Sequence, residues 1–247
     1  MLAPPHWCLV DCISDLHLQR QDEKTFAAFR RYLETTPADA VFILGDWFEV
    51  WVGDDILQIG DPFIAECVAV VRQAAQRLDI FVQHGNRDFL MGQALMQACH
   101  ATLLPDPCVL EFANQRWVFS HGDAWCIADT EYQRFRHQVR NPQWQNAVLQ
   151  RPLSERLQLA KQIRQQSSKN SVYADVDTAL VQQTLRQFHA HYLIHGHTHR
   201  PARHTLEAGR ERWVLSDWDM NATPPRADVL RLGGSQRIIQ RINLPCF

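Results

Sequence analysis

The sequence predicts a layered α/β protein with a two-sheet core and an inserted helical cap. Three observations indicate this fold class. Apolar runs alternate with amphipathic stretches in the N-terminal half, a stretch without strands follows from about residue 130 to 186, and short extended segments close the chain. Such an order of elements is typical of stacked sheets and helices that share one core.

The N-terminal half alternates between predicted strands and predicted helices. Its predicted strands are short apolar runs that end in Gly or polar residues, at 8–14, 40–44, 80–83 and 116–120. Its predicted helices have apolar residues three or four positions apart, which form one face. They lie at 22–34, from Pro62 onwards, and at 89–98.

The second half begins with the helical stretch and returns to strands. A strand is expected at 192–194, and extended segments at about 203–207, 211–216, 226–232 and 236–241 suggest an antiparallel sheet. We therefore expect a core made of residues 1–128 and 187–247, with residues 129–186 inserted as a helical cap.

Composition excludes several classes of protein. The 247-residue chain is 46% hydrophobic and 21% charged, which is typical of a globular protein and not of a disordered one. Its net charge of −2 argues against a surface that binds nucleic acid throughout. No apolar run is long enough to span a bilayer, and the N-terminus lacks the basic start of a signal peptide. Seven cysteines without a C-x-x-C pair favour reduced thiols and a cytoplasmic location.

Five predicted strand ends have polar residues of one chemical kind. They are Asp15-Leu16-His17, Gly45-Asp46, Gly85-Asn86-Arg87-Asp88, His121-Gly122-Asp123 and Gly196-His197-Thr198-His199. Loops at one edge of a sheet commonly present functional side chains. Asp, His and Asn without a thiolate suit a divalent ion such as Mn²⁺, Mg²⁺ or Fe²⁺. Each cluster alone is more often a turn, but the five together favour a metal-dependent phosphoester or pyrophosphate hydrolase.

The ordered set resembles the calcineurin-like metallophosphoesterases, whose pattern is D-x-H, G-D, G-N-H/R, H and G-H-x-H. The stretch from Gly45 to Asp55 also resembles the G-D-x-F-E-x-W-x-G-D-D motif of the UDP-2,3-diacylglucosamine diphosphatases of lipid A biosynthesis. The resemblance extends from about residue 8 to 245, and it departs at Ser216, where glycine is usual. It implies a four-layer αββα sandwich with an inserted helical cap.

The resemblance also implies the residues of the site. Two divalent ions are expected, with Mn²⁺ as the metal. One ion would be held by Asp15, His17, Asp46 and His199, and the other by Asp46, Asn86, His121 and His197. Arg87 and Asp46 would be the catalytic residues, and Asp123 would orient His121. The expected substrate contacts are Asn86, Arg87, Asp129, Ser167, Lys169, Asn170 and His197.

The implied reaction is hydrolysis of the pyrophosphate bond of UDP-2,3-diacylglucosamine by a dimetal-activated water, giving UMP and 2,3-diacylglucosamine 1-phosphate (lipid X). Between Arg134 and Lys169 there are eight basic residues, and Glu155 is the only acidic one. Apolar residues are interspersed among them, a composition typical of helices at anionic membrane surfaces. We therefore expect a cytoplasmic monomer that docks on the inner membrane, holds the acyl chains in its cap and binds no nucleic acid.

Several alternatives remain open from the residues alone. The same core occurs in cyclic-nucleotide and phosphoprotein phosphatases, in metallonucleases and in scaffolds that do not catalyse. The long cap disfavours the open site that a phosphoprotein needs, and its few aromatic residues disfavour a nuclease. The complete ligand set disfavours a scaffold. Arg87 has a simpler interpretation as a surface ion pair with Asp88, and His195 as a core histidine.

Overall fold

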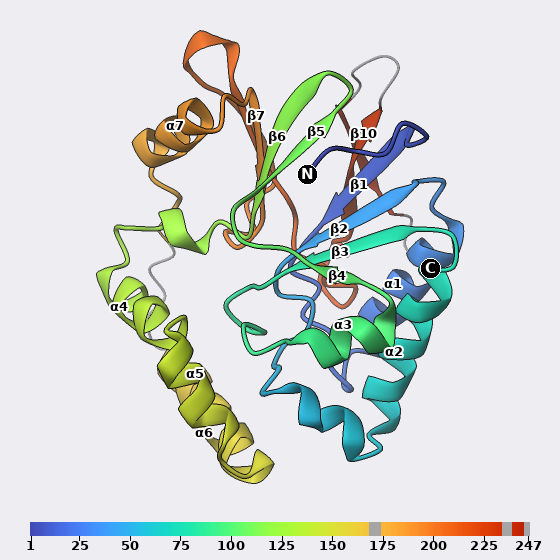
Figure 1. Cartoon of the computed structure of the whole chain (residues 1–247), viewed down its shortest axis with the longest axis vertical. Coiled ribbons are helices and arrows are strands. Elements are labelled where there is room, and N and C mark those ends of the chain that lie inside the picture. The colour runs from blue at the N-terminus through green and yellow to red at the C-terminus, as the bar shows by residue number, and fades with distance from the viewer. Residues whose placement is uncertain (168–173, 234–238, 245–247) are drawn as a thin grey trace.

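In the computed structural model, two mixed β-sheets pack face to face and helices cover both outer faces (Figure 1). The structure describes residues 1–167, 174–233 and 239–244. The first sheet consists of β1 (Leu9–Ile13), β2 (Ala40–Leu44), β3 (Asp79–Gln83), β4 (Thr102–Leu103), β10 (Asp228–Gly233) and β11 (Ile239–Asn243). The second consists of β5 (Cys108–Phe112), β6 (Gln115–Ser120), β7 (Tyr192–His195), β8 (Ala202–Thr205) and β9 (Glu211–Val214). The helices are α1 (Glu23–Thr35), α2 (Pro62–Ala74), α3 (Gln93–Cys99), α4 (Thr130–Val139), α5 (Pro142–Leu149), α6 (Leu153–Ser167) and α7 (Thr178–Gln187).

The strand order allows the loops after five strands (β1, β2, β3, β6 and β7) to meet at one edge of the two sheets. The first sheet runs β11-β10-β1-β2-β3-β4 and the second runs β5-β6-β7-β9-β8. Strands β1, β2 and β3 are parallel, and so are β6 and β7. The carboxyl ends of parallel strands meet at the same edge of a sheet, so the loops that follow these strands can converge.

The alternation of side chains in β2 shows how the layers form. Val41 and Ile43 pack with the residues of α1 and α2, whereas Phe42 and Leu44 pack between the two sheets. On the far side, Val181 of α7 packs against the second sheet. These contacts confirm the predicted four-layer αββα sandwich. No helix in the described part of the chain is long and apolar enough to cross a membrane.

The structure corrects three details of the predicted elements. The C-terminal segments do not form one antiparallel sheet, because β8 and β9 pair in the second sheet while β10 and β11 pair in the first. Strand β5 was not predicted, although its burial alternates along the strand. Helix α3 begins only at Gln93, because Gly92 and the turn before it are not helical.

The region predicted as a cap has two parts. Helices α4, α5 and α6 extend along one side of the molecule as an arm (Figure 1). Helix α7 instead forms the outer layer on the second sheet. The division of the chain at residues 129 and 186 remains a prediction.

Candidate active site

The structure brings the seven predicted ligand residues together where five strands end. They follow β1, β2, β3, β6 and β7, and they are Asp15, His17, Asp46, Asn86, His121, His197 and His199. Their side-chain atoms form two adjoining groups.

The first group contains Asp15, His17 and His199. The ligand atoms of these three residues all lie within 4.8 Å of one another. The Nε2 atoms of His17 and His199 are 3.4 Å apart, and Nε2 of His199 lies 3.3 Å from Oδ1 of Asp15. Oδ2 of Asp46 lies 3.8 Å from Nε2 of His17. This group is the set expected around one ion.

The second group is centred on the amide oxygen of Asn86. This Oδ1 lies 3.0 Å from Nε2 of His121 and 2.9 Å from Nδ1 of His197. Oδ2 of Asp46 is 3.8 Å from Nε2 of His121, the same distance as from Nε2 of His17 in the first group. The carboxylate of Asp46 therefore lies between the two groups, as a shared ligand would.

The backbone at the site is held in an uncommon conformation. Five of the seven residues have a positive φ: Asp15, His17, Asp46, His197 and His199. A left-handed conformation costs a residue with a side chain on the order of 1–3 kcal/mol and persists only where the surroundings enforce it. Here the loops bind each other, since the amide of Asp15 donates to Gly45 O at 3.1 Å and that of His17 donates to Asp46 O at 3.0 Å.

The donor set fits divalent cations. Nδ1 of His121 lies 3.0 Å from the carbonyl of Leu44, which can only accept, so this nitrogen carries a proton, and in the neutral ring Nε2 keeps its lone pair. That lone pair faces the amide oxygen of Asn86, and a cation satisfies two such facing acceptors. Burial lowers the pKa of His121, but Asp46 and Asp15 raise it to about 9 overall, so these carboxylates favour a positive charge at this ring. Without an ion that charge is a proton on Nε2, whose place a bound cation would take.

Two glycines allow the loops to approach the carboxylates. A Cβ on Gly85 would lie 2.0 Å from Oδ1 of Asp46, and one on Gly196 would lie 2.2 Å from Oδ2 of Asp15. Real side chains do not tolerate such contacts, so only glycine fits at either position. The glycines of the predicted clusters thus have a packing role at the ligands.

Arg87 is directed to the site and not to Asp88. The carboxylate of Asp88 is buried and accepts hydrogen bonds from the amides of Trp47 and Gly85, both at 2.7 Å. The surface ion pair between Arg87 and Asp88 is therefore the wrong interpretation. The amide of Arg87 donates to Oδ1 of Asp46 at 2.8 Å, and its guanidinium lies 3.8 Å from Glu49.

A cavity of about 280 Å³ lies between the core loops and the helices α4 to α6. Of the expected substrate contacts, Asn86, Arg87 and Asp129 line it. His197 lies beside it, with its ring 5.6 Å from that of the lining residue Tyr132. The predicted contacts Lys169 and Asn170 lie outside the described residues, and so does the side chain of Ser167, although α6 extends to that residue.

Three side chains near the site have roles that sequence reasoning missed. Oε2 of Glu49, a residue within the motif from Gly45 to Asp55, lies 3.1 Å from Nδ1 of His17. Tyr132 borders the cavity and donates a hydrogen bond of 2.6 Å to Asp123. Asp123 was expected to orient His121, but that ring is held by Leu44, and Asp123 binds helix α4 instead.

Comparisons with known proteins agree with this fold. The family model for the calcineurin-like phosphoesterases matches residues 9–201. A solved structure of an archaeal phosphodiesterase superposes with a TM-score of 0.53 over 96% of this chain and 99% of that one. At 11% identity, this likeness concerns the fold alone. Fold, site and family define a metal-dependent hydrolase.

Curated relatives narrow the class. A UDP-2,3-diacylglucosamine hydrolase of Bordetella pertussis is 42% identical over 245 residues, which cover 95% of this chain and 92% of that protein. The protein of the same name from Ralstonia nicotianae is 42% identical over 239 residues, which cover 89% and 87%. The chain belongs to the calcineurin-like phosphoesterases and, within them, to the family of the UDP-2,3-diacylglucosamine hydrolases.

Proposed function

We propose that this chain hydrolyses the pyrophosphate bond of UDP-2,3-diacylglucosamine to UMP and 2,3-diacylglucosamine 1-phosphate, a step of lipid A biosynthesis. The observation that carries the proposal is a single cavity that borders the ligand cluster at Asn86 and continues between apolar cap residues. A substrate with a diphosphate and two acyl chains needs both surroundings at once. The relatives named above act on a substrate of this kind.

The ligand cluster supports two divalent ions, with Mn²⁺ as the proposed metal. Asp15, His17, Asp46 and His199 would hold one ion, and Asp46, Asn86, His121 and His197 the other. When bound, two such ions supply Lewis-acid activation of water and neutralise charge on the phosphoryl oxygens.

The head-group contacts come from the side chains at the cluster's edge. The guanidinium of Arg87, with 27% of its side chain exposed, borders the cavity and matches the oxygens of a phosphate. Asp129 caps α4 by accepting a 2.9 Å hydrogen bond from the amide of Tyr132, and it also lines the cavity. We assign Asp129 to the sugar, together with Asn86, His197 and the positions Ser167, Lys169 and Asn170.

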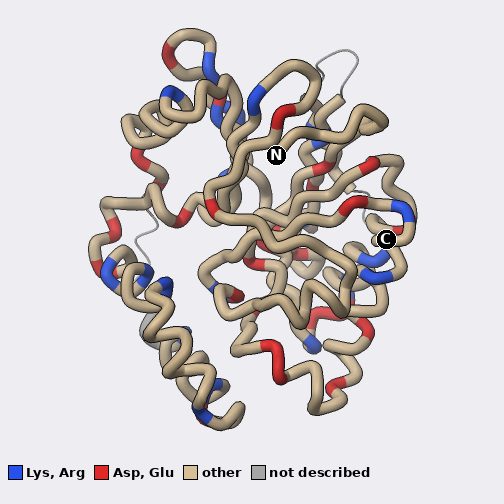
Figure 2. Tube along the Cα trace, in the orientation of Figure 1, with Lys and Arg blue, Asp and Glu red and all other residues tan. Residues whose placement is uncertain are grey.

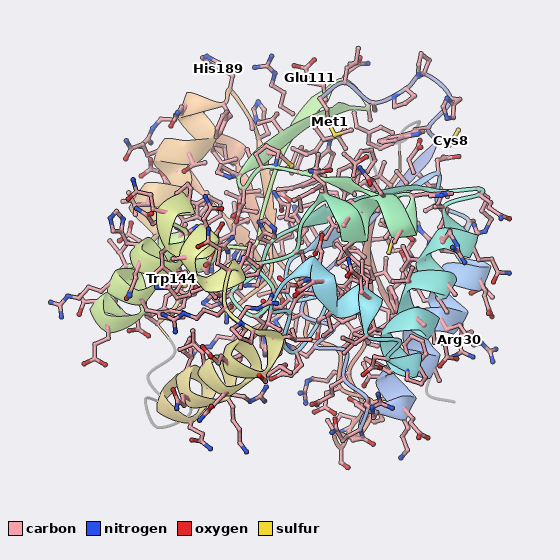
Figure 3. All side chains as sticks on the ribbon, turned by 60° about the horizontal axis from the view of Figure 1, so that its bottom comes forward. Met1, Cys8, Arg30, Glu111, Trp144 and His189 are labelled. Atoms are coloured by element: carbon pink, nitrogen blue, oxygen red, sulfur yellow. The ribbon has the colours of Figure 1, made fainter. Side chains whose placement is uncertain are left out.

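Helices α4 to α6 of the predicted cap supply the apolar part of the cavity. Trp144 of α5, labelled in Figure 3, has its ring 6.2 Å from that of Phe89 in the core. Val148, Leu159 and Ile163 line the same cavity from α5 and α6. We assign this region to the acyl chains.

Membrane docking rests on fewer charges than the sequence suggested. Lys and Arg are frequent along α4 to α6 (Figure 2), but four of the arginines bind core partners. They are Arg136, Arg140, Arg156 and Arg164.

The remaining exposed groups include Arg151 and Lys161, close in sequence to Leu149 and Leu157, which are 40% and 44% exposed. Each exposed cation near an anionic bilayer contributes about 1 kcal/mol. We propose weak docking of a cytoplasmic monomer on the inner membrane. Vesicle sedimentation that does not respond to salt would contradict it.

A substrate panel tests the function. The purified chain, loaded with Mn²⁺, is assayed with UDP-2,3-diacylglucosamine, unacylated UDP-glucosamine, a cyclic nucleotide and a chromogenic phosphodiester. We expect kcat/KM to be highest for the acylated substrate, activity to be lost in EDTA, and Mn²⁺ to restore it better than Ca²⁺, which prefers more oxygen ligands. Preference for the cyclic nucleotide, or full activity in EDTA after dialysis, would contradict the proposal.

A further inference from the structure

One face of α6 forms a wall of the cavity over more than two turns. The lining residues recur every three or four positions, at Arg156, Leu159, Ala160, Ile163 and Arg164. Because an α-helix rises 1.5 Å per residue, the eight steps from 156 to 164 span roughly 12 Å. The two ends of this wall are charged and its middle is apolar.

The Arg164 end faces the ligand cluster. Arg164 contacts the carboxylate of Glu49, and the other oxygen of Glu49 lies 3.1 Å from Nδ1 of His17. The proposed function would therefore place the diphosphate at this end, with an acyl chain extending along α6 towards Arg156.

The Arg156 end is closed by a fully bonded ion pair. Arg156 is 2% exposed, and its Nη1 donates to the carbonyl of Val52 at 2.5 Å and to Oδ1 of Asp55 at 2.8 Å. Its Nε donates to the carbonyl of Arg151 at 3.0 Å, and its Nη2 contacts the second oxygen of Asp55. With all three nitrogens engaged, Arg156 is not free to bind a substrate phosphate.

The core backbone packs directly against this end. Gly53 has a φ of +127°, and a Cβ there would lie 2.3 Å from Nη1 of Arg156 and 2.7 Å from Cδ2 of Leu149. The side chain of Asp55, the partner of Arg156, is 49% exposed. The ion pair thus has the cavity on its Arg156 side and solvent on its Asp55 side, and the backbone at Gly53 leaves no room for a side chain beside it.

We propose that the Arg156–Asp55 ion pair is the end wall of the acyl cavity and limits the length of the chain that the enzyme accepts. A longer chain would have to displace Arg156 from all its partners, and the burial of one more methylene does not offset that loss. The inference rests on the proposed function and adds a specificity residue to it.

The test measures kcat/KM on UDP-2,3-diacylglucosamines whose acyl chains lengthen stepwise, in mixed micelles. Wild type is expected to lose roughly tenfold or more at one step, the discrimination typical of a single methylene at a closed pocket. Arg156→Met, which keeps an unbranched side chain and leaves Asp55 in solvent, should move this drop to longer chains. Ala160→Leu, which fills the apolar middle, should move it to shorter ones.

Arg186→Met, the same substitution on the exposed outer layer, is the matched control and should keep the wild-type profile. Metal content and circular dichroism establish that each variant is folded. If Arg156→Met does not fold, an unchanged profile for Ala160→Leu still overturns the inference. If wild type hydrolyses the acylated substrates and both variants keep its profile, the end wall is contradicted and the proposed function stands. If no acylated substrate is hydrolysed, the proposed function is contradicted as well.

Discussion

Asp46 is the residue on which both halves of the site depend. Its Oδ2 is 3.8 Å from Nε2 of His17 and 3.8 Å from Nε2 of His121, and its Oδ1 accepts the amide of Arg87. One carboxylate therefore connects both predicted ligand groups and the loop of Arg87, which we propose binds the substrate.

Asp46→Ala should release both metals and lower turnover by more than the 10–100-fold typical of residues that only support a ligand. Asp46→Asn keeps an oxygen for the amide of Arg87 and should lose less. Elemental analysis of the dialysed proteins, beside their activities, measures the effect. Two metals retained in Asp46→Ala would be incompatible with a shared ligand.

Arg87→Ala should lower turnover by about 10²-fold or more while metal content stays at the wild-type level, because the lost contact is a charge-assisted one to the substrate. Arg87→Lys keeps the charge without the planar fork and should be intermediate. Metal loss in Arg87→Ala would instead assign Arg87 to the support of the Asn86 loop.

The residue types at the strand ends were sufficient to predict that five polar clusters lie together, because each cluster follows a strand. The choice of seven ligands within those clusters came from the family resemblance, since residue type alone does not separate a ligand from a neighbouring Asp or His. The role of Glu49 was not predictable in this way. Its contact with His17 depends on how the loops after β1 and β2 approach each other, which no local pattern contains. Arg164 reaches Glu49 from a helix more than a hundred residues away.

At the scale of elements, α4 is joined to two ligand loops. The buried carboxylate of Asp123 accepts hydrogen bonds from Tyr132 at 2.6 Å and from Arg136 at 2.9 Å. Arg140, at the end of the same helix, donates to the carbonyl of Gly85 at 2.9 Å. The position of the cap is thus coupled to the loops of His121 and Asn86.

Asp123→Asn should destabilise the chain by about 3–5 kcal/mol at pH 7, since it leaves Arg136 partly buried without its counter-charge. Burial raises the pKa of Asp123, but His121, Arg136 and Arg140 lower it by more than burial raises it. The pKa of this carboxyl is therefore well below its ordinary value. A carboxyl with a lowered pKa stabilises the fold above about pH 4 and loses this contribution as the pH falls below it. The difference between wild type and Asp123→Asn should therefore shrink in acid.

Urea unfolding at pH 7 and at progressively lower pH measures both effects. Asp177→Asn is a suitable control, because Asp177 only caps α7 and asparagine caps equally well. An Asp123→Asn chain as stable as wild type at pH 7 would show that α4 is held by other contacts.

The secondary structure was predictable where one face of an element is apolar, as in α1 and α2. It was less predictable where a partner in space decides the outcome. The segments near 202–243 all have strand character, but only the packing of two sheets divides them into β8–β9 and β10–β11. Similarly, the helical pattern of α7 follows that of α4 to α6 along the chain, and only its contact with the second sheet shows that it forms the outer layer there.

At the scale of the whole molecule, two sheets bring loops from residue 15 to residue 199 into one site. The positive φ of five predicted ligand residues is a folding cost that bound cations would offset. A ligand present at a hundred times its Kd stabilises the folded state by about 2.7 kcal/mol. For a chain of this size, each kcal/mol raises Tm by roughly 2–4 °C. Chelation should therefore lower Tm by several degrees and Mn²⁺ should restore it, whereas an unchanged Tm would contradict a preformed cation site.

The most direct test of the proposed reaction is hydrolysis of UDP-2,3-diacylglucosamine in ¹⁸O-labelled water, followed by mass spectrometry of both products. We propose, as the resemblance to the UDP-2,3-diacylglucosamine diphosphatases implies, that water attacks the phosphorus next to uridine. One ¹⁸O atom is therefore expected in UMP and none in the acylated sugar phosphate. Label in the lipid product would place the attack on the other phosphorus, and an uncleaved substrate would contradict the function itself.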